Sequence, residues 1–115
     1  MRINYISVKN QYDDLHCYPN APEEVAYLKS LHRHTFFIES IIQVFHEDRE
    51  LEFYMVKDFI DTLIPELRMV SDNKSCENIG NIILTKLQEK YGANRRIQVE
   101  VSEDGRNKAI VTEEG

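Results

Sequence analysis

The stretch HTFFIESIIQVF, residues 34–45, decides the fold, because it is apolar on both of the faces that a strand would present. Side chains alternate between the two faces of a strand, and branched and aromatic residues favour strands. One face carries Phe36, Ile38, Ile42 and Val44, and the other carries Phe37, Ile41 and Phe45. A strand of this kind needs helices over one face and further sheet or a partner subunit over the other.

The segments on either side of this stretch predict a strand before it and a helix after it. RINYISV, residues 2–8, is rich in strand formers and leads into a long polar connection with many turn formers. EFYMV, residues 52–56, predicts a short extended piece, after which Asp58 stands where a helix N-cap belongs. Pro65 is expected to end or bend this first helix.

The C-terminal half predicts a second helix and a closing hairpin. Ser75 can cap the helix, Glu77 favours its first turn, and an apolar stripe runs on to Gly92. RRIQVEVSE (95–103) and KAIVTEE (108–114) flank DGRN, which contains an Asp-Gly turn signal. The predicted fold is therefore one α+β domain over residues 1–115, with four antiparallel strands and two helices in the order ββααββ.

Composition and charge limit the classes of partner. A chain of 115 residues with 42% hydrophobic residues has room for one modest core. The formal net charge of −6 leaves no basic stripe for a phosphate backbone, so nucleic acid is not an expected partner. Arg95, Arg96, Arg106 and Lys108 lie near one another in sequence, and they form either a local anion pocket or an ordinary solvated surface.

The sequence offers no sign of a membrane or of an oxidising compartment. No apolar run approaches the roughly 20 residues of a membrane helix, and the first residues lack the apolar centre of a signal peptide. Cys17 and Cys76 are far apart and have no Cys-x-x-Cys spacing, so we expect free thiols. The expected location is the cytoplasm.

The histidines at the head of the central strand suggest a metal site. His32 and His34 point to one face of a strand with Cβ atoms about 7 Å apart, which suits a shared ion, although such pairs also occur by chance. A catalytic zinc site typically takes three protein ligands. His46 lies roughly 40 Å away along the strand, so the third ligand is His16 or a carboxylate.

Glu103 ends a row of aliphatic side chains in the last hairpin. The face that carries Ile97, Val99 and Val101 continues to position 103. A carboxylate there needs a donor, and it could accept two N–H groups from a guanine-like ring. Alternatively, the strand has frayed at this point and Glu103 is in solvent.

Five segments together resemble the 6-pyruvoyltetrahydropterin synthase and 6-carboxytetrahydropterin synthase family, which has the tunnelling fold. LHCYP (15–19) is similar to its first metal-histidine segment, and LHRHTF (31–36) to its His-x-His segment. YMVKDFIDTL (54–63) and NKSCENIGNIILTKL (73–87) are similar to its two helix segments, and VEVSEDGRNKAIV (99–111) to its last hairpin. The segments occur in the family's order and cover most of the chain from His16 onward.

The resemblance implies a site, an assembly and a ligand. It implies zinc on His16, His32 and His34, and a homohexamer built from two trimers, whose sheets join across subunits into a barrel. It also implies an inter-subunit pterin pocket, in which Glu103 anchors the ring of a dihydroneopterin triphosphate-like ligand. Ser75, at the family's Thr position, then reaches across to that ring. Cys76 either lines the pocket or, as a small residue near a helix start, only packs there.

The departures from the family concern proton transfer. Leu28 occupies the position of the bacterial catalytic Cys. PELRMVSDN (65–73) is shortened where the family has an assisting Asp-His pair and contains no His, and Arg68 and Met69 stand nearest to that pair in register. Cys17 lies beside a ligand but faces the opposite way on a strand. Two functions follow: a zinc-dependent lyase acting on a pterin triphosphate with an unrecognised base, or a module that binds a pterin or guanine-type nucleotide without chemistry. A purely structural subunit would leave the histidines unexplained.

Overall fold

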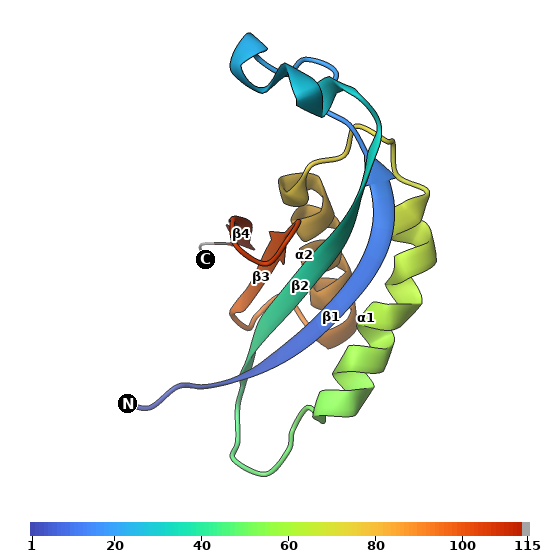
Figure 1. The fold of residues 1–115 in the computed structure, drawn as a ribbon. Helices are drawn as coiled ribbons and strands as arrows, with labels where there is room; N and C mark the ends of the chain where they lie inside the picture. The colour runs from blue at the N-terminus through green and yellow to red at the C-terminus, as the bar shows by residue number, and fades with distance from the viewer. Residues whose placement is uncertain (114–115) are drawn as a thin grey trace.

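Four strands form one antiparallel sheet with two α-helices on one of its faces, as the sequence predicts (Figure 1). The computed structural model describes residues 1–113. Its elements are β1 (Asn4–His16), the 3₁₀ helix η1 (Glu23–Lys29), β2 (His32–Val44), α1 (Phe53–Arg68), α2 (Cys76–Tyr91), β3 (Ile97–Ser102) and β4 (Lys108–Thr112). The strands follow one another across the sheet in the order β1-β2-β3-β4.

Strand β1 is much longer than predicted. The polar residues after Val8 continue the strand as far as His16, so the prediction of an irregular connection from residue 9 is wrong up to that point. They do so because every second side chain still faces the helices, Asn10 and Tyr12 among them. Asn10 is only 5% exposed, and its Nδ2 donates to the carbonyl oxygen of Lys57 (3.0 Å) and to Oδ1 of Asp61 (2.8 Å) on α1.

Helix α1 begins earlier and ends later than predicted. Its N-cap is Glu52, whose Oε2 accepts from the N–H of Met55 at 2.9 Å, so the extended piece over residues 52–56 and the cap at Asp58 are both wrong. Pro65 lies inside the helix, which continues to Arg68. Leu67 is fully buried in the core, and this packing stabilises the last turn despite the backbone hydrogen bond that proline cannot make.

Helix α2 and the closing hairpin confirm the prediction. Oγ of Ser75 accepts from the N–H of Asn78 (3.1 Å), while Oδ1 of Asn78 accepts from the N–H of Ser75 (3.0 Å), which forms a capping box. Gly92 ends the helix with φ +103°, a conformation that favours glycine. Strands β3 and β4 pair antiparallel, and Glu114, at the end of the predicted last strand, lies outside the described residues.

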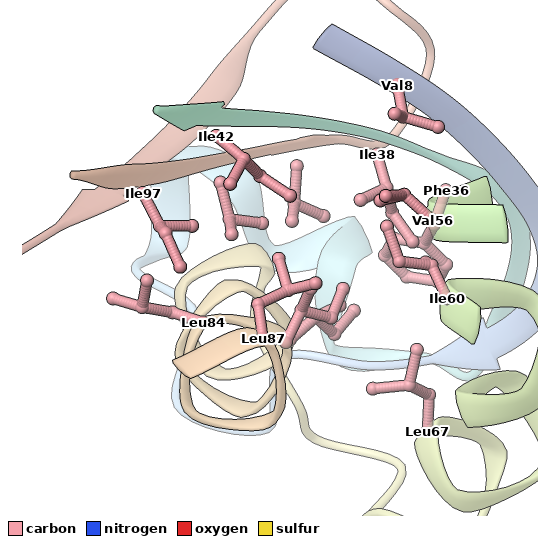
Figure 2. Close-up of a cluster of buried hydrophobic side chains, with 14 of the residues drawn as sticks. Val8, Phe36, Ile38, Ile42, Val56, Ile60, Leu67, Leu84, Leu87 and Ile97 are labelled. Carbon is pink, nitrogen blue, oxygen red and sulfur yellow. The ribbon is translucent and has the colours of Figure 1, made fainter. Parts of the chain in front are cut away.

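The core lies between the sheet and the helices, and it contains side chains from one face of β1, β2 and β3 (Figure 2). The register aligns Val8 with Ser40 and Ser40 with Val99, so these three residues share the helix-side face. On the opposite face of β2, Phe37 stays 37% exposed, and Phe45, just past the strand end, is 54% exposed. The central strand is thus apolar on both sides, as predicted, but in this chain only one side is covered.

Candidate metal centre

The register of β1 and β2 brings His16 directly opposite His32. These two residues are the last of thirteen consecutive pairs, which begin with Asn4 and Val44. His34 lies two residues further along β2, opposite Asp14, and points to the same face. One ring nitrogen from each of His16, His32 and His34 lies within 4.8 Å of the others, so the three imidazoles could hold a metal ion.

Backbone carbonyl groups fix the tautomer of two of these histidines. Nδ1 of His32 lies 2.7 Å from the carbonyl oxygen of Ser30, and Nδ1 of His16 lies 3.4 Å from that of Lys74. A carbonyl oxygen only accepts, so Nδ1 carries a proton, and in the neutral imidazole the lone pair then lies on Nε2. Both Nε2 atoms are buried without a hydrogen-bond partner among the described residues, which is the arrangement of a histidine prepared for a metal.

Burial favours the neutral, metal-binding form of His16. The residue is 6% exposed, and this burial lowers the pKa of its imidazole below the ordinary value, while the nearby carboxylate of Glu103 acts in the opposite direction. Metal ligation requires an unprotonated imidazole nitrogen. Desolvation and tautomer therefore both prepare His16 as a ligand.

Glu103 lies against the histidines of its own chain. Its Oε1 is 3.2 Å from Nε2 of His16, and its Oε2 is 3.6 Å from Nε2 of His34. Strand β3 ends at Ser102, which pairs with Phe37 of β2. Glu103 is the next residue, so it lies just beyond the β2–β3 pairing and close to the histidines. The face predicted for Glu103 from strand alternation is therefore the face on which the histidines lie.

Lys74, which was not predicted as a site residue, is buried next to the histidine cluster and contacts the end of β1. The side chain of Lys74 is fully buried, and its Nζ lies 2.7 Å from Oδ2 of Asp14, two residues before His16. The carbonyl of the same residue is the group that orients His16. The N–H of Cys17 also donates to the carbonyl of Asp72 (2.8 Å), so the segment before α2 is attached to the end of β1. Lysine is seldom buried, and no sequence signal marked this one.

The predicted ligand-binding residues Ser75 and Cys76 lie at the start of α2. Cys76, Glu77, Glu103 and Asp104 line one hollow of about 410 Å³ together with Asn107 and Lys108. Burial, with the charges of Glu103, Glu77 and Asp104, raises the pKa of the Cys76 thiol to about 12. Cys76 is thus a neutral thiol near pH 7, and it is not an activated nucleophile.

The structure separates the residues that would have formed an anion pocket. Arg95 and Arg96 precede β3, whereas Arg106 and Lys108 follow it, so they lie at opposite ends of the strand. Arg95 pairs with Glu50 at 2.8 Å, and Lys108 pairs with Glu100. The four residues thus form no joint anion pocket, and the alternative of a solvated surface is also wrong for Arg95, whose side chain is 9% exposed.

The remaining sequence candidates stay outside the histidine cluster. His46 is exposed in the turn after β2, as the distance argument predicted. Arg68 stacks over the ring of Tyr12 (5.9 Å) and donates from Nε to the carbonyl of Asp13 (3.3 Å). Leu28 lies on η1, where its carbonyl accepts from the N–H of Tyr18 (2.7 Å).

Comparison with known proteins gives no relative of this chain. No protein-family model matches the sequence, and a search of curated proteins finds no similar protein. Within residues 1–113, no helix is both long enough and apolar enough to cross a membrane.

Proposed function

We propose that this chain is a zinc protein, in which His16, His32 and His34 hold the metal ion. The observation that carries the proposal is the convergence of three imidazole nitrogens, two of them buried, without a hydrogen-bond partner and oriented by backbone carbonyls. The all-nitrogen donor set suits Zn²⁺ better than Mg²⁺ or Ca²⁺, which prefer oxygen ligands. Bound zinc would supply a Lewis acid beside the hollow at the start of α2.

The ligand that we propose for this hollow is a pterin or a guanine-type ring. Glu77, Glu103 and Asp104 make its lining acidic, and carboxylates accept hydrogen bonds from the N–H groups that such rings present. Lys108 is the one cation among the lining residues, and it is paired with Glu100. An acidic lining favours the ring itself over a phosphate group. The resemblance to the pterin synthases supports the same ligand class.

Binding without chemistry is the second candidate, and specific contacts favour it. The Cys76 thiol stays protonated, and Arg68, which stands nearest in sequence to the family's missing acid–base pair, is held by Tyr12 and Asp13. A general acid or base must titrate near the working pH and reach the reacting atom. A sequestering or sensing role needs only the metal and the ring-binding carboxylate.

The assembly that we propose is a homohexamer of the tunnelling-fold type, a dimer of trimers. Phe37 and Phe45 stay exposed on a side of the sheet that neither α1 nor α2 covers (Figure 1), and sheets joined across subunits would bury them. The pterin pocket would then lie between subunits. Size-exclusion chromatography with light scattering measures the mass of the assembly; a monomer at micromolar concentration would contradict this part of the proposal.

The metal proposal has a direct test with a matched control. Protein purified without chelator should contain about one zinc per chain, and His32→Ala should remove it, because a three-ligand site tolerates the loss of one ligand poorly. His46→Ala makes the same change at an exposed histidine outside the cluster and should keep the zinc. Zinc lost equally from both variants, or absent from the unaltered protein, contradicts the site.

The ligand proposal is tested by calorimetry on zinc-loaded protein. The panel is neopterin, dihydroneopterin triphosphate, guanosine and GTP, which separates the ring from its phosphates. We expect the rings to bind, and incubation with the triphosphate followed by chromatography distinguishes turnover from binding alone. No heat with any member of the panel would contradict the ligand class while leaving the metal site intact.

A further inference from the structure

The contact between Glu103 and the histidines carries a further inference about the metal centre. In the neutral imidazole of His16 the lone pair lies on Nε2, because Nδ1–H faces the carbonyl of Lys74 at 3.4 Å. The carboxylate of Glu103, which can only accept, lies 3.2 Å from that atom. Two acceptors at this distance make no hydrogen bond, and a cation between them would stabilise both.

The spacing of these atoms fits ligands of one ion. Metal bonds of about 2.0–2.1 Å in a tetrahedral arrangement put neighbouring donor atoms about 3.3 Å apart. The two contacts between Glu103 and the imidazole nitrogens are 3.2 and 3.6 Å. They involve different histidines, so the carboxylate lies over the cluster rather than beside one ring.

We propose that Glu103 is a fourth and displaceable metal ligand, which closes the site of three histidines when no other ligand is bound. The inference depends on the proposed metal site but not on the proposed pterin. A fourth protein ligand is typical of structural zinc, whereas a catalytic site keeps that position open. In this chain Glu103 would occupy the fourth coordination position when no other ligand is bound, and it would vacate that position when another ligand binds.

The surroundings of Glu103 permit such a movement. Its side chain is 34% exposed, compared with 8% for that of His16, and it also lines the hollow of about 410 Å³ at the start of α2. It belongs to a hairpin connection that turns at Gly105, with φ +83°, rather than to the β1–β2 ladder. A ring that donates N–H groups into the hollow would therefore compete with the metal for this one carboxylate.

The test uses Co²⁺ as the metal and azide as a small competing ligand. The visible absorption of bound Co²⁺ reports its coordination, and it is recorded for the unaltered protein, Glu103→Gln and Glu103→Ala. We expect both variants to bind Co²⁺ about tenfold or more weakly, and to bind azide about tenfold or more tightly, because azide no longer displaces a carboxylate. Glu89→Gln, at an exposed carboxylate of α2 outside the hollow, is the matched control and should behave as the unaltered protein.

Three outcomes decide the matter. Weaker Co²⁺ and tighter azide binding in both Glu103 variants, with no change in Glu89→Gln, supports the fourth ligand. Equal Co²⁺ and azide affinities in all four proteins overturn it and leave a plain ion pair between Glu103 and the histidines. No Co²⁺ binding in any of them overturns the metal site itself, and neopterin calorimetry then reports separately on the hollow.

Discussion

Lys74→Met should destabilise the chain far more than an ordinary lysine substitution. The side chain of Lys74 is fully buried and pairs with Asp14 at 2.7 Å, so the change leaves a carboxylate with only 15% exposure and no cation. Breaking a buried pair costs about 3–5 kcal/mol. Oδ1 of Asp14 still accepts from the N–H of Leu15 at 2.8 Å, which favours the lower end of that range. We therefore expect a loss of about 3 kcal/mol, or roughly 10 °C in Tm.

The assay is urea unfolding followed by circular dichroism, with chelator present so that metal binding does not contribute. Lys86→Met is the matched control, because Lys86 pairs with Glu66 at 3.6 Å on the surface and should cost less than about 1 kcal/mol. Adding Asp14→Asn to Lys74→Met should recover much of the loss, since no buried charge is then unpaired. Equal effects of the two lysine substitutions would refute the argument that the Lys74 ammonium stabilises this end of the sheet.

Three further predictions concern α2 and its surroundings. Ser75→Ala removes the capping oxygen and should lower the free energy of unfolding by about 1 kcal/mol, measured in urea; an unchanged midpoint would contradict the cap. Gly80→Ala puts a Cβ 2.8 Å from Cγ2 of Val111, so it should destabilise by about 1 kcal/mol, and adding Val111→Ala should restore stability. In a Cys17→Ser background, iodoacetamide should alkylate Cys76 at pH 8 roughly a thousandfold more slowly in the folded than in the unfolded chain. The reason is that a thiol pKa of about 12 leaves little thiolate at this pH. Comparable rates in the folded and unfolded chains would contradict the burial of the thiol.

The fold was predictable where local chemistry and tertiary packing favour the same structure. Helix α2 has its cap at Ser75 and its end at Gly92, and both positions carry the residue types that such ends require. Helix α1 was misjudged because Glu52 is a less common cap than Asp58, and because Pro65 is outweighed by the burial of Leu67. In the second half of β1, local composition favoured a loop, and only the long pairing with β2 makes it a strand.

The candidate site was predictable in its members but not in its geometry. Alternation puts His32 and His34 on one face of β2 and Glu103 on the face of the aliphatic row in β3. The position of His16 depends on the register between two strands, which no single segment specifies. The support from Lys74 depends on a loop between helices packing against a strand end almost sixty residues earlier in the chain, and single-sequence patterns carry no such information.

The arrangement of the four proposed ligands suggests why Glu103 would be the one that exchanges. His16 and His32 close a ladder of thirteen pairs, and the ring of His16 packs edge-on against Phe36 at 5.2 Å, so these ligands are held by the core itself. Their Nδ1 atoms are held by carbonyls, which leaves little freedom to rotate. Among residues 1–113, the Glu103 carboxylate contacts the histidines, and the residue belongs to the hairpin connection that follows β3. A rigid set of three ligands can keep a metal while the fourth exchanges, and this is the property that a site needs if it is to bind a second molecule without losing its ion.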